Sequence, residues 1–160
     1  MLSLLALVAT LQVPSVDAPP IDSTHCSAAA RFLRDTQHLV TAIDTDTIDD
    51  GRTHQRVAGC RITSAGGTCV SLRTEAPKLY ERLRAAGWTR TPVPRDAPNE
   101  GALRFRWQRS DCLFNINAEA MLNTDAEMRV NDAVVLKAGE TRYQVFVMCM
   151  PAMAAPDQAR

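Results

Sequence analysis

Five cysteines carry most of the chemistry that this sequence could perform: Cys26, Cys60, Cys69, Cys112 and Cys149. Several thiols in one short exported chain are typical of a disulfide-stabilised domain. Spacing alone does not choose the pairs. The alternation of side chains along predicted strands ranks them, because only residues on one face of a sheet can meet.

Parity favours a bond between Cys112 and Cys149. Cys112 shares a predicted strand face with Phe114, and Cys149 shares one with Val147. If both faces line one core and the two strands are neighbours, the Cβ atoms come within disulfide distance. We therefore predict a Cys112–Cys149 disulfide.

Cys26 lies on the apolar side of a predicted helix, from which it can reach Cys60 or Cys69. We favour Cys60, and which cysteine stays unpaired is left open. Each bond would stabilise the fold by about 2–4 kcal/mol, mainly by restricting the unfolded chain. The alternative is that all five cysteines are small buried hydrophobic residues.

His25 precedes Cys26 at a predicted helix N-terminus, where the helix dipole lowers the pKa of a thiol. Consecutive helical residues point about 100° apart, so His25 is poorly placed as a base for Cys26. The other histidines, His38 and His54, show no ligand or catalytic spacing. We predict no catalytic residue.

Sulfur ligands also gather near the C-terminus, at Met148, Cys149, Met150 and Met153. Such soft ligands suit Cu(I), but strand alternation turns Cys149 away from the neighbouring methionines. A copper-binding protein is therefore an alternative function only, and we expect no cofactor or metal site. The acidic segment 44–51 is not a calcium loop, because Ile48 and Val57 occupy two of its ligand positions.

A mixed polar and apolar row is predicted along one sheet face. Apolar residues beside arginine and asparagine are typical of interfaces, although a plain solvated face is the alternative. The row predicts a surface that binds a protein or a cell-envelope component. Its members are Arg104, Arg106, Asn115, Asn117, Phe146 and Met148.

A β-hairpin must position most of these residues. Two alternating runs flank Ser110-Asp111, and closing the turn there pairs Trp107 with Phe114 on one face. A slip by one residue would invert the whole pattern.

The helices are marked by apolar periodicity and by capping residues. One is predicted from Asp22 or Ser23 to about Ile43, and a second from a Thr74 cap to a stop at Gly87. Segments 44–51 and 64–67 are interpreted as turns, and 120–132 gives no clear pattern. Further strands are predicted at 56–62, 69–72, 134–136 and 143–150.

This order predicts an α+β fold, with two helices packed on one face of a mostly antiparallel sheet of about four to six strands. The predicted boundaries are a signal peptide at 1–18, a linker at 19–22, a single α+β domain at 23–150 and a flexible tail at 151–160. The apolar run near the N-terminus is too short to cross a bilayer.

The chain is therefore expected in the periplasm or outside the cell, without a transmembrane anchor once mature. Its 18 basic and 18 acidic residues give no net charge, which argues against nucleic acid as a partner. The preference for arginine over lysine indicates a bacterial source. We predict a non-catalytic binding module; a thiol or hydrolytic enzyme is a weaker alternative, and the oligomeric state is left open.

Overall fold

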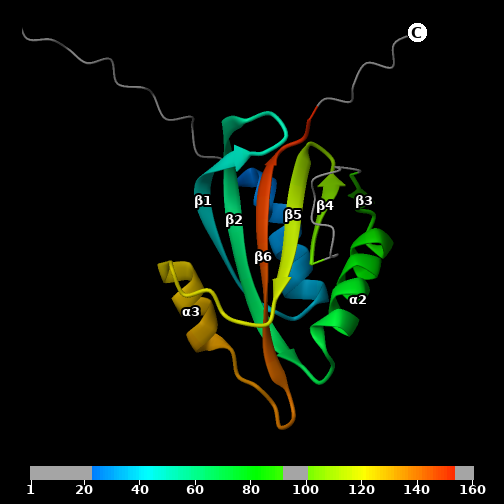
Figure 1. Ribbon diagram of the computed structural model, residues 1–160, viewed down its shortest axis with the longest axis vertical. Coiled ribbons are helices and arrows are strands. Elements are labelled where there is room, and N and C mark those ends of the chain that lie inside the picture. Colours follow the sequence, from blue (N-terminus) through cyan, green and yellow to red (C-terminus); the bar gives the residue numbers. More distant parts are fainter. Residues whose placement is uncertain (1–22, 92–100, 154–160) are drawn as a thin grey trace, which may run out of the picture.

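The computed structural model describes residues 23–91 and 101–153. They form one six-stranded antiparallel sheet in the order β1-β2-β6-β5-β4-β3, with helices on both faces (Figure 1). The predicted signal peptide and linker, and most of the predicted tail, lie outside the described residues. The strands are β1 (Val40–Asp50), β2 (Gln55–Thr68), β3 (Thr89–Arg90), β4 (Ala102–Trp107), β5 (Ser110–Asn117) and β6 (Thr141–Pro151). The helical elements are η1 (Thr24–Cys26), α1 (Ser27–Arg31), η2 (Phe32–Thr36), α2 (Leu72–Ala85) and α3 (Asp125–Ala133).

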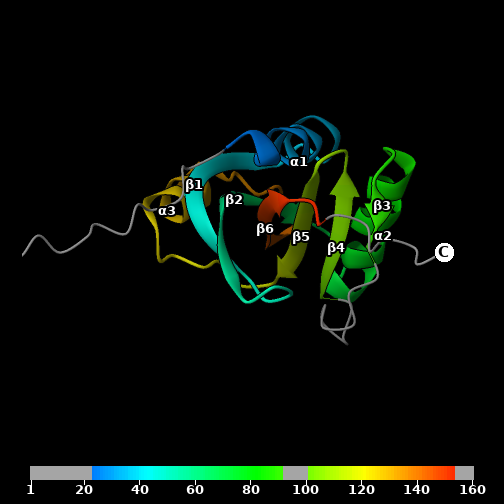
Figure 2. The same ribbon diagram turned by 90° about the horizontal axis from the view of Figure 1, so that it is seen from above.

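The inner face of the sheet carries the main core. Residues such as Ile62, Phe105, Phe114 and Val147 are fully buried there, because alternate positions of β2, β4, β5 and β6 point the same way. The continuous helical segment 24–36, called here the N-terminal helix, packs on this face together with α2. In Figure 2, α1 lies on one side of β5 and β6, and the β1–β2 turn lies on the other.

The expected α+β class with an antiparallel sheet is confirmed, but the structure has a third helix on the outer face. In α3, Thr124 and Glu127 form a reciprocal capping box. Val130 packs with Ala65 in a small second core beneath α3. Among the described residues, no helix is long and apolar enough to cross a membrane.

The predicted first helix is too long. It ends at Thr36, His38 follows with a φ of 55°, and Val40 begins β1. The acidic segment 44–51, expected to be a turn, belongs mostly to this strand. Its β-branched residues suit a strand, and β1 gains a full ladder of hydrogen bonds with β2. Tertiary pairing therefore outweighs the helical spacing of the apolar residues.

The predicted turn at 64–67 is also wrong, because β2 runs through it to Thr68. Gly66 serves a close approach: a Cβ there would lie 2.5 Å from Cδ2 of Leu39. No strand forms at 69–72; instead Ser71 is the N-cap of α2, so the predicted cap Thr74 lies in the first turn of the helix. The segment 134–136 is likewise not a strand, so β6 pairs with β2 and β5 only.

The predicted hairpin forms, but its turn lies at Gln108-Arg109. Trp107 therefore pairs with Ser110, and Phe114 pairs with Leu103. The register differs from the predicted one by an even number of residues. For that reason the division of side chains between the two faces is kept although every partner changes.

Both predicted disulfides are present. Cys26 is bonded to Cys60, Cys112 is bonded to Cys149, and Cys69 is an exposed free thiol. Cys60, Cys149 and Cys112 lie directly opposite one another on β2, β6 and β5, all on the inner face. The first bond ties the N-terminal helix to the sheet, and the second ties β5 to β6.

Candidate binding groove

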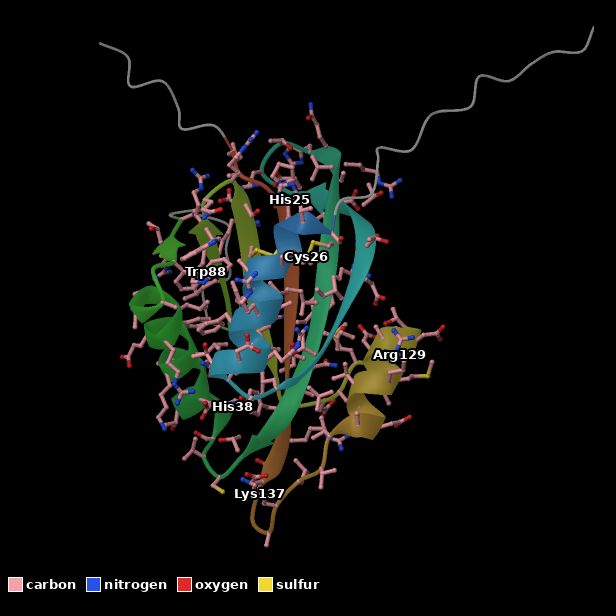
Figure 3. All side chains as sticks on the ribbon, turned by 180° about the vertical axis from the view of Figure 1, so that it is seen from behind. His25, Cys26, His38, Trp88, Arg129 and Lys137 are labelled. Carbon is pink, nitrogen blue, oxygen red and sulfur yellow. A yellow bond between two sulfur atoms is a disulfide. The ribbon has the colours of Figure 1, made fainter. Side chains whose placement is uncertain are left out.

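A groove of about 1160 Å³ opens at one end of the inner face. One wall is the N-terminal helix, and the other is the β4–β5 turn with the end of β6. Trp88 and Trp107 line it, and their ring centroids are 5.5 Å apart. Figure 3 shows the His25 and Cys26 end of the helix near Trp88.

Trp88 reaches the groove because of the way α2 ends. Gly87, with a φ of 92°, donates its N–H to the carbonyl of Arg84, and Trp88 donates to the carbonyl of Leu83. These two bonds form a Schellman motif, which requires a left-handed residue and favours glycine. The motif reverses the chain and buries the indole, leaving it 5% exposed against Phe114 and Trp107.

The two disulfides anchor the groove walls to the sheet. Cys26 lies between His25 and Ser27, which both line the groove. Cys112 and Cys149 lie two residues from the lining residues Ser110 and Pro151. Each wall is therefore covalently attached to the sheet within two residues of the groove, which restricts its movement.

A side-chain hydrogen bond joins the two walls directly. Nδ1 of His25 and Oγ of Ser110 lie 2.7 Å apart, and both side chains are half-buried. The carbonyl of His25 also lies 3.8 Å from the sulfur of Cys112. These contacts hold the helix end against the first residues of β5.

Arginines from both walls lie at the groove. Arg31 from the helix and Arg109 from the turn are exposed, and neither side chain is bonded to another described residue. Asp35 is the acidic group in the lining. Arg106 also lines the groove, but its guanidinium binds Asp111 and the carbonyl of Met153. The available charge at the groove is therefore positive on balance.

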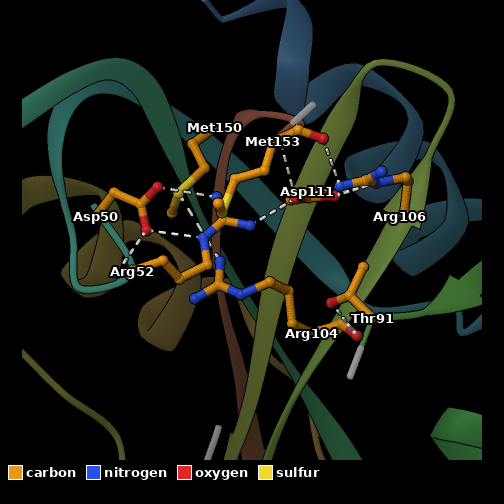
Figure 4. A network of polar contacts seen from close by, with 8 residues as sticks. All are labelled: Asp50, Arg52, Thr91, Arg104, Arg106, Asp111, Met150 and Met153. Atoms are coloured by element: carbon orange, nitrogen blue, oxygen red, sulfur yellow. Dashed lines mark hydrogen bonds and ion pairs between the residues drawn. The ribbon is translucent and has the colours of Figure 1, made fainter. Parts of the chain in front are cut away.

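A second polar feature lies on the outer face, where the β1–β2 turn folds over the sheet (Figure 4). Arg52 donates to Asp50 at 2.8 Å and to Asp111 at 2.6 Å, and Arg106 donates to Asp111 at 2.7 Å. Asp111 is fully buried and Asp50 is 4% exposed. The cluster is a closed ion-pair network that joins β1, β4 and β5.

Burial alone would raise the pKa of Asp111. The hydrogen bonds from Arg106, Arg52 and the amide of Met153 outweigh it and hold this pKa below the usual carboxyl value. The same balance lowers the pKa of Asp50, through the side chain and amide of Arg52 and the charge of Arg104. Both carboxyl groups are therefore ionised at neutral pH.

The predicted binding face is on the outer face as expected, but its arginines are not available. Arg104 is 6% exposed and points Nη1 at the sulfur of Met150, while Arg106 belongs to the network. The other members of the row are half-buried: Asn115, Asn117, Phe146 and Met148. Whether these bind a partner stays a prediction.

The residues considered for other chemistry do not converge. Cys149 is oxidised on the inner face, whereas Met148 and Met150 lie on the outer face, and Met150 is buried. His25 and His38 lie at opposite ends of the N-terminal helix (Figure 3). Within residues 23–91 and 101–153, no group of three or more His, Cys, Asp or Glu side chains could hold a metal ion.

The sequence did not reveal the groove. Gly87 and Trp88 signalled the end of α2, but nothing local indicated that Trp88 would meet Trp107. Arg31 and Arg109 come from segments far apart in sequence, and nothing near either residue distinguishes it from an ordinary solvent-exposed arginine. Comparisons with protein-family models, with curated proteins and with solved structures find no match to this chain.

Proposed function

We propose that this chain is an exported, non-catalytic binding module that holds a protein or a cell-envelope component in the groove between the N-terminal helix and the β4–β5 turn. The observation that carries the proposal is the position of the disulfides, each within two residues of a groove wall. A site fixed before binding loses less conformational entropy when its ligand arrives. Covalent bracing at this end of the sheet therefore favours recognition.

Export to the periplasm or the exterior is supported by the same bonds, because disulfides persist in oxidising compartments. The free thiol Cys69 is exposed and lies outside both pairs. The domain is disulfide-stabilised, and we propose that it is located in the periplasm or outside the cell.

A serine hydrolase is the second candidate, favoured by the 2.7 Å contact between His25 and Ser110 in the groove. We expect the pair to act as a structural link between the walls. A fluorophosphonate probe, which loses fluoride when a nucleophilic serine attacks its phosphorus, should not label the protein. Labelling that disappears in Ser110→Ala would contradict the non-catalytic assignment.

The binding surface can be tested by filling the groove. Ser27 is exposed on the helix wall, so Ser27→Trp places a large ring at the groove. Immobilised wild-type and variant proteins would be incubated with a cell-envelope extract under non-reducing conditions. We expect a component captured by the wild type to be lost with Ser27→Trp and kept with Arg129→Trp, an exposed position on α3.

The predicted outer face provides the competing result. If Phe146→Ala with Met148→Ala abolishes capture and Ser27→Trp does not, the outer face is the binding surface and the groove assignment is wrong. Thermal melts of each variant would check that the fold is intact.

A further inference from the structure

We infer that the groove binds an extended acidic peptide segment of a partner protein, with an apolar side chain of the peptide placed against Trp107. This inference rests on the proposed function and adds the chemistry of the occupant. It is built from the size of the groove, the apolar residues in its lining and the arginines on its two walls.

The groove is large enough to hold an extended chain. Typical small-molecule sites enclose roughly 300–1,000 Å³ and bury most of the ligand. This groove is larger, at about 1160 Å³, and is bounded by segments from both ends of the domain. An extended peptide can lie between two such walls and leave one side in solvent.

The lining is mixed, and its apolar residues can accommodate a hydrophobic side chain. Trp107 is half-buried, so part of its ring is accessible, and it rests on the buried ring of Trp88. Phe32 from the helix and Met153 after β6 also line the groove. Aromatic surfaces of this kind act as anchor sites at protein interfaces.

The positive charge of the groove favours a peptide with acidic residues. Arg31 and Arg109 stand on opposite walls, and both guanidinium groups are exposed and uncommitted within the described residues. Among the described residues of the lining, Asp35 is the one acidic side chain that opposes them. Carboxylates on either side of an apolar anchor can pair with both arginines, whereas a basic peptide would meet two like charges.

The chain supplies its own reporter. Its two tryptophans are Trp88 and Trp107, and both line the groove. Tryptophan fluorescence therefore reports groove occupancy directly when the probe contains no tryptophan. The probe is a short synthetic peptide that alternates Glu and Phe, compared with a Lys–Phe and a Glu–Ser counterpart.

The full oxidised domain would be titrated with each peptide at low and high salt. We expect the Glu–Phe peptide to change the fluorescence saturably and to bind more weakly as salt rises, because the exposed ion pairs are screened. Arg31→Ala with Arg109→Ala should weaken binding roughly tenfold, since two exposed ion pairs are lost. The matched control, Arg73→Ala with Arg129→Ala, removes two exposed arginines that do not line the groove and should leave binding unchanged.

Three results would overturn the inference: equal binding of the Lys–Phe peptide, unchanged binding by Arg31→Ala with Arg109→Ala, or no response to any peptide at millimolar concentration. A uronic acid oligosaccharide would be titrated in parallel, and saturable binding of the sugar without the peptide would also overturn it. Capture that depends on Ser27 would still support the proposed function in each case. If neither peptide binding nor Ser27-dependent capture is observed, both the proposed function and the acidic-peptide inference are wrong.

Discussion

Trp88 and Trp107 meet at the groove with ring centroids 5.5 Å apart, one held by the end of α2 and the other by the last position of β4. The contact depends on Gly87, where a Cβ would lie 3.1 Å from Cζ3 of Trp107. The glycine that ends the helix therefore also makes room for the aromatic pair.

Gly87→Ala should destabilise the domain more than Gly139→Ala does. Both glycines have a positive φ, of 92° and 82°, so each substitution carries backbone strain of about 1 kcal/mol. Only the Cβ at Gly87 meets another side chain, because nothing lies within 4 Å at Gly139. Urea denaturation would measure the difference, and near-ultraviolet circular dichroism should change for Gly87→Ala alone. Equal effects of the two substitutions would show that the ring contact adds nothing.

Removing the strand-to-strand disulfide should lower the free energy of unfolding. Cys112→Ala with Cys149→Ala releases a loop closed over a sequence separation of 37 residues. The expected loss is about 2–4 kcal/mol, because the unfolded chain regains conformational freedom. Cys69→Ala removes an exposed free thiol and should leave stability unchanged. Denaturation of the three proteins without reductant provides the comparison.

The ion-pair network predicts a pH-dependent contribution to stability. The pKa of Asp111 is lower in the folded state than in the unfolded chain, so the unfolded state takes up the proton first as pH falls. Its contribution is complete above the unfolded carboxyl value of about 3.9 and is lost as pH drops toward the folded value. Asp111→Asn should cost about 3 kcal/mol at neutral pH. The gap between wild type and variant should narrow below about pH 4, and a constant gap would contradict the assigned role.

Export predicts a specific covalent state of the mature protein. We expect the mass of protein recovered from the periplasm or medium to lack residues 1–18. Reduction should increase the mass by four hydrogens, two for each disulfide. Mass spectrometry with and without reductant tests both points. Recovery of the full-length chain with five free thiols from the cytosol would contradict the proposal.

The sequence predicted which side chains of a strand share a face, because successive side chains of any strand point to opposite faces. That parity placed Cys112 and Cys149 on the core face and supported their pairing. It also placed Arg104, Arg106 and Phe146 together on the other face. Gly87 was identified as a helix end for an equally local reason, since few residues other than glycine adopt its backbone conformation.

Tertiary contacts decided what local patterns left ambiguous. Residues near Val40 suit a helix or a strand, and pairing with β2 made them a strand. In the sequence, Gly66 suggested a turn. In the structure it lies within β2, and the side chain of Leu39 occupies the space that a Cβ at this position would need. In the hairpin, the predicted division of side chains between the two faces is correct, but the predicted cross-strand pairs are not. The register is fixed by the pairing of β5 with β6 and of β4 with the short β3.

The sequence by itself determined which side chains of β4, β5 and β6 share a face, which places Cys112 and Cys149 together, and where α2 ends. Each of these depends on backbone geometry over a few residues. Only the tertiary structure decided that Arg106 is bound by Asp111, while Arg31 and Arg109 line the groove with no partner among the described residues. Those outcomes depend on which distant segments meet. The meeting of such segments reflects the packing of the whole domain and leaves no signature at any single position.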